Sequence, residues 1–248
     1  MKQVVEIIAR CAEGTCVSRP FRVRADDGSL YWIKGMGTGW NRNELCYELL
    51  CAKLASEIGL PVAGFEVLDV PEVLLEFCAV PGIRDLSAGP AFGSRYVEHV
   101  SSLLPVEVSS VPQDLRWKIL LFDWWVQNED RTLGEKGGNV NLLWNPVDQQ
   151  LTVIDHNNAF DSEFDEVAFF EHHVFREERS RIPASFLLEQ KQRFANMAGR
   201  FGDLIKDFPD EWVEQDERPG DFIPETANAI LNRFDKLLDV FGGQANEK

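Results

Sequence analysis

The chain has 248 residues, of which 44% are hydrophobic, and it includes 17 Phe and 7 Trp. This composition provides for a large buried core, in one domain or in two lobes. The net charge of −16 argues against a nucleic-acid groove, which needs a basic face, and disfavours docking on an anionic membrane.

The N-terminal residues, MKQVVEIIARCAEG, contain too short an apolar run for a secretory signal. No apolar stretch has the length of a transmembrane helix. The cysteines are odd in number and lack the spacing of paired metal ligands, so we expect free thiols in a reducing compartment. The adjacent histidines His172 and His173 are expected on a surface helix. These features predict a cytoplasmic protein without nucleic-acid or membrane partners.

The first third of the chain shows a strand-rich pattern interrupted by one helix. The second and third strands are joined by Asp26-Asp27-Gly28, a hairpin turn signal. The helix has apolar residues at helical spacing, follows Asn41 or Asn43 as a cap, and stops at Gly59. The expected strands are Val4–Arg10, Phe21–Ala25, Ser29–Gly35, Ala63–Val70 and Val73–Cys78, and the helix is Glu44–Ile58.

The segment PGIRDLSAGPAFGS, rich in Gly and Pro, predicts a linker, and the pattern after it is mainly helical. A β-hairpin interrupts the helices, and polar clusters stand on both sides of it. The expected helices are Pro112–Gln127, Pro183–Phe201 and Thr226–Phe241, and the hairpin strands are Val140–Trp144 and Leu151–Ile154.

The polar clusters contain residues that could bind a metal ion and a phosphate group. Asp130 follows an apolar helix, Asn139 enters the hairpin and Asp155 leaves it, so the hairpin could present all three together. Carboxylate and amide oxygens suit Mg²⁺ that also binds phosphates. Phosphoryl transfer needs such a metal, a base or orienting carboxylate, and a lysine on the nucleotide. Lys34 ends an apolar strand, and Glu44 opens the next helix and could pair with it. Taken singly, each residue is more typical of a surface charge or a turn.

Several motifs in order resemble the HipA-like kinases, over the chain from the first strand to about Asp161. They are Lys34, Asn43-Glu44, EIGLPV, Asn128-x-Asp130-Arg131, Gly138-Asn139 and Ile154-Asp155-His156. The resemblance implies an α+β, two-lobed protein-kinase-like fold. Its N-lobe would be small and mainly antiparallel β with one helix, and its C-lobe larger and mainly helical. We expect the N-lobe at residues 1–81, the C-lobe at 82–242 and a disordered tail at 243–248.

The resemblance also implies an ATP- and Mg²⁺-dependent kinase that phosphorylates Ser or Thr on a protein substrate, itself included. Asp130 would be the catalytic base, and Asn139 and Asp155 would hold Mg²⁺. Lys34 would bind the α- and β-phosphates, positioned by Glu44, with Glu48 one turn away as the alternative partner. Gly14 and Ser18 would belong to the nucleotide loop, where Thr15 and Ser18 are the hydroxyls available for phosphorylation. Arg131 is expected to anchor the catalytic loop by an ion pair.

The sequence departs from the family pattern in two places. The interval RTLGEKGG between Asp130 and Asn139 is long, which leaves Asn141 as a fallback ligand, although strand alternation would place it on the opposite face. The nucleotide loop AEGTCVSRP lacks the familiar glycine fingerprint. These departures keep two alternatives open: a nucleotide-binding pseudokinase that acts through partners, and a kinase for a small molecule or a lipid headgroup.

Overall fold

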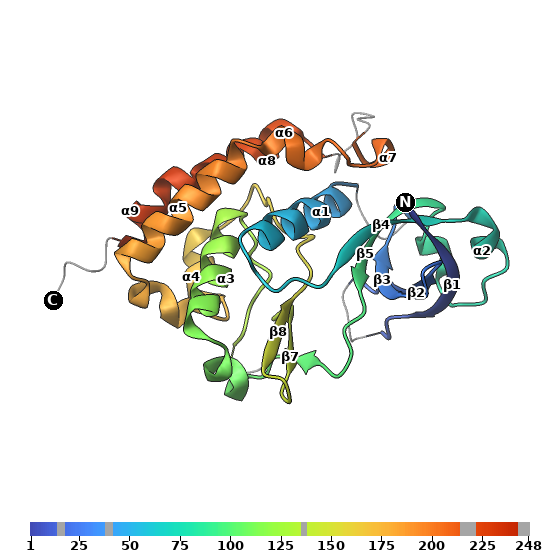
Figure 1. Cartoon of the computed structure of the whole chain (residues 1–248), viewed down its shortest axis with the longest axis horizontal. Helices are drawn as coiled ribbons and strands as arrows, with labels where there is room; N and C mark the ends of the chain where they lie inside the picture. Colours follow the sequence, from blue (N-terminus) through green and yellow to red (C-terminus); the bar gives the residue numbers. More distant parts are fainter. Residues whose placement is uncertain (14–17, 38–41, 135–137, 214–221, 243–248) are drawn as a thin grey trace. The chain divides into compact units, whose positions relative to one another are not determined.

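A computed structural model of the chain describes residues 1–13, 18–37, 42–134, 138–213 and 222–242 (Figure 1). The chain divides into two compact units. Unit 1 comprises Met1–Leu49, Ala63–Glu98 and Phe208–Phe222, and unit 2 comprises Leu50–Val62, His99–Asp207 and Ile223–Lys248. Within the described ranges, no helix combines the length and the apolar composition that crossing a bilayer requires.

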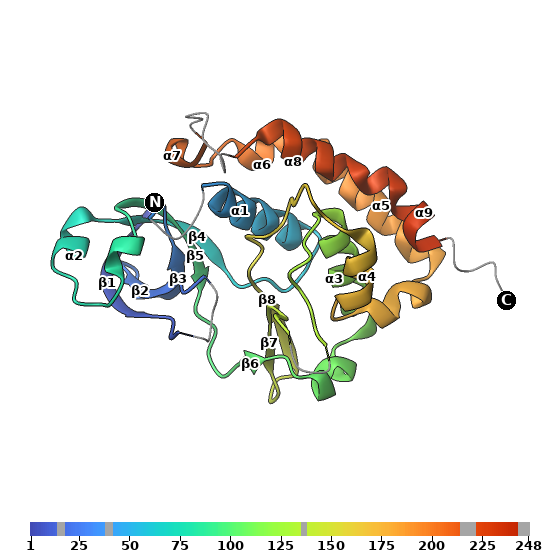
Figure 2. The same cartoon turned by 180° about the vertical axis from the view of Figure 1, so that it is seen from behind.

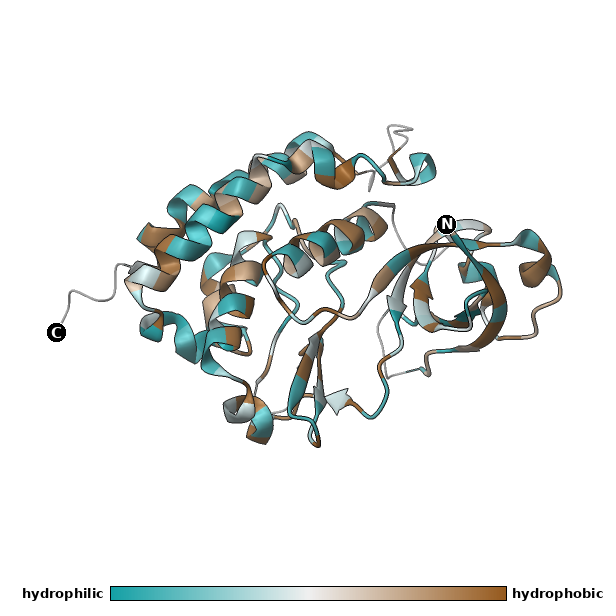
Figure 3. Cartoon of the chain, viewed as in Figure 1, coloured by the Kyte–Doolittle hydropathy of each residue, from teal (hydrophilic) through white to brown (hydrophobic). Residues whose placement is uncertain are grey.

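Unit 1 is built on a closed β-barrel with the strand order β1-β2-β3-β5-β4. Neighbouring strands are antiparallel except β1 and β4, which pair in parallel and close the barrel. Side chains of alternate residues point inward, where Phe21, Val23, Tyr31 and Ile33 form part of the core. Figure 3 shows hydrophobic residues along these strands. The strands are β1 (Lys2–Arg10), β2 (Phe21–Ala25), β3 (Leu30–Lys34), β4 (Phe65–Val70) and β5 (Gly89–Arg95).

Two features of unit 1 differ from the sequence prediction. The predicted strand Val73–Cys78 is wrong: helix α2 (Glu72–Glu76) stands there and packs Leu74 and Leu75 on the barrel core, since β4 already has β1 and β5 as neighbours. The predicted linker contains β5, which pairs with both β3 and β4. The boundary predicted at residue 81 therefore falls inside unit 1, which runs on to Glu98.

Unit 2 combines helices with a three-stranded sheet in the order β6-β7-β8. The predicted hairpin forms as β7 and β8, and the two-residue strand β6 pairs with β7. Helices α5 and α9 lie side by side in both views (Figures 1 and 2). The strands are β6 (Ser101–Ser102), β7 (Leu142–Asn145) and β8 (Gln150–Val153), and the longer helices are α3 (Gln113–Trp125), α4 (Glu166–His172), α5 (Ala184–Ala198) and α8 (Pro224–Leu231).

The remaining elements are short, apart from helix α1, which crosses the division between the units. The predicted C-terminal helix Thr226–Phe241 is broken: α8 ends at Leu231, and the 3-10 turn η4 separates it from α9. These elements are α1 (Arg42–Glu57), η1 (Ile83–Asp85), η2 (Pro105–Ser110), η3 (Arg176–Arg181), α6 (Phe201–Ile205), α7 (Asp210–Val213), η4 (Asn232–Lys236) and α9 (Leu237–Gly242).

The cysteines only partly fit the expectation of free thiols. Cys46, Cys51 and Cys78 form no disulfide bond, and the first two are buried. Cys11, which directly follows β1, is disulfide-bonded. The expectation of free thiols is therefore wrong for Cys11, because an odd count and irregular spacing do not reveal which residues the chain brings together. The cytoplasmic location stays a prediction.

Candidate active site

Lys34 is the last residue of β3 and is only 7% exposed. Its neighbours Tyr31 and Ile33 belong to the barrel core, whereas Lys34 forms an ion pair with Glu48 of α1, itself 2% exposed. A buried ammonium group is costly without such a partner. The lysine is therefore held in one place by a carboxylate on the second turn of the helix.

Glu48 is the partner that the sequence analysis named as the alternative to Glu44. Glu44 lies one turn nearer the start of α1, where its backbone N–H donates to Asn43 Oδ1 at 2.9 Å. The role assigned to Glu44 stays a prediction. So does that of Ser18, which lies half-buried in a bend before β2, and Gly14 and Thr15 lie outside the described residues.

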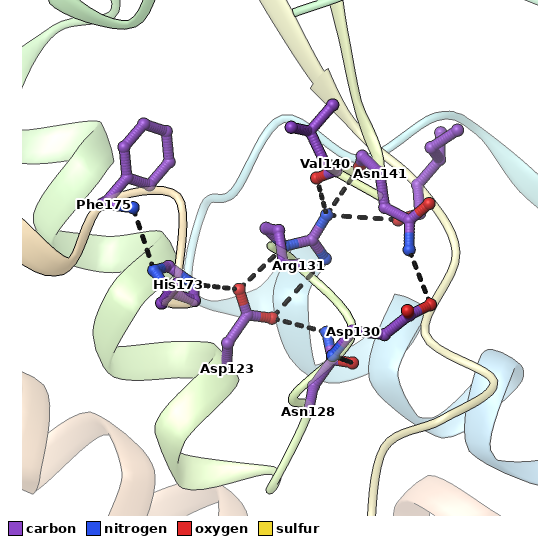
Figure 4. Close-up of polar contacts among 9 residues, drawn as sticks. Asp123, Asn128, Asp130, Arg131, Val140, Asn141, His173 and Phe175 are labelled. Carbon is purple, nitrogen blue, oxygen red and sulfur yellow. Dashed lines mark hydrogen bonds and ion pairs between the residues drawn. The ribbon is translucent and has the colours of Figure 1, made fainter. Parts of the chain in front are cut away.

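In unit 2, a carboxylate at the end of α3 is completely buried (Figure 4). Asp123 accepts from Arg131 Nε at 2.7 Å on one oxygen and from Asn128 Nδ2 at 2.9 Å on the other. Arg131 is buried as well. The predicted ion pair of Arg131 is thus confirmed, and its acid comes from α3, the helix that precedes the loop of Asp130.

His173 completes this network from the end of α4. Its Nε2 lies 3.0 Å from Asp123 Oδ2, and its Nδ1 accepts from Phe175 N–H at 3.1 Å, so Nε2 carries the hydrogen (Figure 4). Burial lowers the pKa of His173, and the contact with Asp123 only partly opposes this. Burial also disfavours the charge of Asp123, but the charge of Arg131 and the hydrogen bond of His173 hold its pKa well below the ordinary range. The expected surface position of His173 is wrong, since it is 1% exposed.

The Nη1 group of Arg131 donates hydrogen bonds to three backbone carbonyls. The acceptors are the oxygens of Asn141 at 2.5 Å, Val140 at 3.3 Å and Ile154 at 3.4 Å. Ile154 N–H in turn donates to the Asn141 oxygen at 3.2 Å. Arg131 therefore joins the strand that enters the hairpin to the segment that leaves it, directly before Asp155.

Asp130 points away from this buried network and is half-buried. Its Oδ2 accepts from Asn139 Nδ2 at 2.7 Å and from Asn141 Nδ2 at 3.1 Å. The expectation that the two asparagines lie on opposite faces is wrong. Asn141 precedes β7 and has a left-handed φ of 47°, so strand alternation does not apply to it. Both amides reach the same carboxylate oxygen.

Gly138 explains how the long interval still returns to Asp130. A Cβ at this position would lie 2.3 Å from the carbonyl oxygen of Thr132, which no side chain tolerates. Beside it, Thr132 N–H donates to the Asn139 oxygen at 2.9 Å. The glycine thus allows residues 138 and 132 to pass in contact, and Asn139 lies within hydrogen-bonding distance of Asp130 across the long interval.

The sequence comparison decides the family, because residues 4–238 match the HipA-like kinases. The chain belongs to the HipA-like kinase family. A search of curated proteins found no match. Among solved structures, the chain is similar to the Helicobacter pylori proinflammatory kinase CtkA, with a TM-score of 0.55, 12% identity and coverage of 97% of this chain and 94% of CtkA. It is also similar to the Golgi casein kinase with Mn/ADP bound, with a TM-score of 0.52, 13% identity and coverage of 100% and 74%. These likenesses show a kinase-like fold.

In this HipA-like kinase, the structure brings Asp130, Asn139 and Asn141 into direct contact. Asp155 follows Ile154, whose backbone bonds to Asn141, and it has a left-handed φ of 58°, which Asp tolerates better than most residues. Among the described residues, no group of three His, Cys, Asp or Glu side chains is placed to hold a metal. The oxygen donors here are instead carboxylates and amides, a set that fits Mg²⁺ with phosphate oxygens completing its coordination.

Sequence reasoning missed the residues that support the site. Asp123 carried a visible signal, a single acid within the apolar run ILLFDWWV, because a buried carboxylate requires partners. Glu129 was also missed. Its side chain accepts from the backbone N–H of Asp165, the N-cap of α4, and burial raises its pKa. Glu129 thereby ties the loop that bears Asp130 to the start of α4.

Proposed function

We propose that this chain is an ATP- and Mg²⁺-dependent protein kinase that phosphorylates Ser or Thr on a protein substrate, itself included. Membership of the HipA-like kinase family supports a phosphotransferase. The Mn/ADP bound to the structurally similar Golgi casein kinase supports the use of a nucleotide and a divalent metal. Units 1 and 2 would correspond to the N-lobe and the C-lobe of a kinase.

The observation that carries the proposal is the setting of Asp130. Two amides orient one of its oxygens, and no Lys or Arg within the described residues forms an ion pair with it, unlike Asp123. A carboxylate that is positioned but not neutralised suits a base or an orienting group for a hydroxyl. In the proposed reaction the hydroxyl oxygen attacks the γ-phosphorus, its proton passes to Asp130, the bond from the γ-phosphorus to the β–γ bridging oxygen breaks, and ADP leaves.

Lys34 is the proposed ligand of the α- and β-phosphates, and its ion pair with Glu48 supports that role by fixing the ammonium group. Asp155 and an asparagine would hold Mg²⁺. Asn141 is favoured over Asn139 because its backbone is bonded to the residue before Asp155 and is fixed by Arg131. Bound Mg²⁺ would neutralise charge on the phosphates.

The proposal is tested with purified protein, γ-labelled ATP, Mg²⁺ and a degenerate Ser/Thr peptide library, followed by intact-mass analysis. Asp130→Asn should reduce transfer by about 10²–10⁴-fold and leave the ATP-dependent rise in melting temperature in place. Asp148→Asn is the matched control, because this carboxylate in the β7–β8 turn also accepts from an asparagine amide, Asn145 Nδ2 at 2.9 Å. It should transfer like the wild type.

Full activity in Asp130→Asn would contradict the role of Asp130. An ATP-dependent melting shift in the wild type without transfer to any acceptor would favour the pseudokinase. If neither transfer nor a melting shift occurs, the proposed function itself fails.

A further inference from the structure

Unit 2 contains a shallow, open cavity of about 590 Å³ that the proposed reaction does not use. It is formed mainly by α8 and η4, together with a residue before the catalytic loop and one from the segment after Asp155. Its lining residues are Gln127, Ser162, Glu225, Thr226, Ala229, Ile230, Arg233 and Lys236.

Within the described residues, the cavity offers one unpaired cation in a chain of net charge −16. Among its lining residues Glu225 is negative, Arg233 is positive but already paired with Glu166, and Lys236 is positive. Lys236 forms no ion pair within the described part of the chain. An anion that enters the cavity therefore meets an ammonium group with no carboxylate to displace.

Arg233 is rigidly mounted at this site. Its guanidinium lies 4.2 Å from the centre of the Trp124 ring and 4.7 Å from that of Phe164, and its Nη2 donates to Glu166 at 3.1 Å. Planar arginine held between aromatic rings loses little conformational freedom when it binds a further acceptor. The group is thus preorganised for an anion with several oxygens.

The other polar lining groups are hydrogen-bond donors. Ser162 and Thr226 supply hydroxyl groups, and Gln127 supplies an amide. A phosphate monoester carries about −1.5 to −2 charge near pH 7 and has three strong acceptor oxygens, which match two cations with neighbouring hydroxyls. We propose that this cavity is a regulatory binding site for a phosphate monoester, with Arg233 and Lys236 as its cationic ligands.

A physical link connects the site to the catalytic loop. In the orientation that satisfies its amide, Gln127 accepts from Arg233 Nη1 at 3.1 Å and donates to the Asp161 carbonyl at 3.2 Å. Gln127 has a left-handed φ of 54° and directly precedes Asn128, which bonds to Asp123. A phosphate that draws on Arg233 would therefore alter the support of the loop that bears Asp130.

The phosphate could come from two sources with the same chemistry. One is a separate phosphorylated ligand. The other is Ser162 itself, exposed at the cavity in the segment between Asp155 and α4. In that case the Ser162 oxygen bonds to the γ-phosphorus of ATP, the β–γ bridging bond breaks, and ADP and the hydroxyl proton leave. This second source rests on the proposed function, whereas the binding site does not.

The first experiment measures binding of O-phosphoserine by the full chain without ATP, by calorimetry and by melting temperature at constant ionic strength. At ten times Kd, the melting temperature should rise by about 3–6 °C. Lys236→Met should weaken binding about tenfold. Lys206→Met is the control, because Lys206 is an exposed lysine of unit 2 outside the cavity, paired only loosely with Asp203 at 3.8 Å. Its affinity should equal that of the wild type.

The second experiment installs phosphoserine at position 162 during synthesis, which requires no activity of the chain. If Ser162 is the source, this protein melts higher than the wild type, loses the O-phosphoserine response, and loses the extra stability in the Lys236→Met background. If the source is a separate ligand, the wild type responds to O-phosphoserine and phosphoserine at 162 adds no stability. Absence of both effects, or equal losses in Lys236→Met and Lys206→Met, would overturn the site even if kinase activity were established.

Discussion

Asp123 and Asp130 stand seven positions apart and serve opposite purposes. Asp123 is completely buried, faces a guanidinium and an imidazole, and has a pKa held well below the ordinary range. Asp130 is half-buried and is oriented by the amides of two asparagines. The Asp123 carboxylate fixes the position of Arg131, and Arg131 in turn bonds to the backbone at both ends of the hairpin. The Asp130 carboxylate forms no ion pair with a Lys or Arg of the described residues, which suits the proposed role toward a substrate hydroxyl. The structural carboxylate and the proposed catalytic carboxylate are therefore two different residues, only seven positions apart.

The largest expected effect is the difference in stability between variants of Asp123 and Asp130. Asp123→Asn removes the charge that pairs with buried Arg131 and should lower the free energy of unfolding by about 3–5 kcal/mol. Asp130→Asn should change it by less than about 0.5 kcal/mol, because Asp130 is only half-buried and an amide oxygen can still accept from the two asparagines. Urea unfolding of both variants gives the two values. Equal losses would show that Asp130 is also a structural carboxylate.

The buried pair of unit 1 offers the next test. Glu48→Gln removes the carboxylate that forms the ion pair with Lys34 and should reduce phosphate transfer by about 100-fold, since a displacement of Lys34, the proposed phosphate ligand, would misalign the reacting groups. Glu44→Gln, one turn away on the same helix, is the matched variant. Steady-state rates with ATP and peptide distinguish the two. A larger loss in Glu44→Gln would restore the partner first expected from the sequence.

Asn139 and Asn141 contact the same oxygen of Asp130 but differ in their backbone anchoring. Asn141→Ala should raise the Mg²⁺ concentration needed for half-maximal rate by about 10–100-fold, as removal of a metal ligand or its close support does. Asn139→Ala should raise it less, because Asn139 is exposed and its backbone bonds to Thr132 rather than to the segment before Asp155. Titration of activity with Mg²⁺ measures both. The reverse order would return the metal role to Asn139.

The smallest effect concerns pH. The folded-state pKa of His173 is lowered from 6.5 by burial, so the unfolded chain binds the proton more readily and stability falls as the pH drops below about 6.5. Asp123 also has a lowered pKa, and its contribution is lost only at more acidic pH, below 3.8. His173→Gln, which can still donate to Asp123, should flatten the dependence between pH 6.5 and 5 in urea unfolding. An unchanged slope would show that another group titrates there.

The elements that were predicted correctly from the sequence are those whose ends coincide with a clear change in the hydrophobic pattern. Hydrophobic periodicity within a short segment predicted the hairpin strands and the long helices α1, α3 and α5. A local motif predicted the ion pair of Arg131. The first part of strand β5 was assigned to a linker because of its glycines, whereas Gly93 lies in the tightly packed barrel beside Leu68. Only the pairing of β5 with distant strands reveals it.

The site shows the same division. The order of Lys34, Asp130 and Asp155 was readable, but the pairing of Lys34 with Glu48 depends on the rotation of α1 relative to β3 within unit 1. Strand alternation predicted the wrong face for the Asn141 side chain, because Asn141 has a left-handed backbone conformation. His173 was expected on a surface helix together with its neighbour His172. Only His172 is exposed, because the buried carboxylate that His173 contacts comes from a helix 50 residues earlier in the chain.

The closed barrel of unit 1 limits how a polypeptide can be recognised. Barrel closure pairs β1 with β4 at Lys2 and Gln3, so no described barrel strand has an edge that is unpaired along its whole length for an incoming chain to extend. In unit 2, the outer edge of β8 is already occupied at Val153, which bonds to Pro61 and bridges to Val62. Within the described residues, β6 pairs on one side only, and it is two residues long. A protein substrate would therefore be selected by side-chain contacts, with little help from β-augmentation.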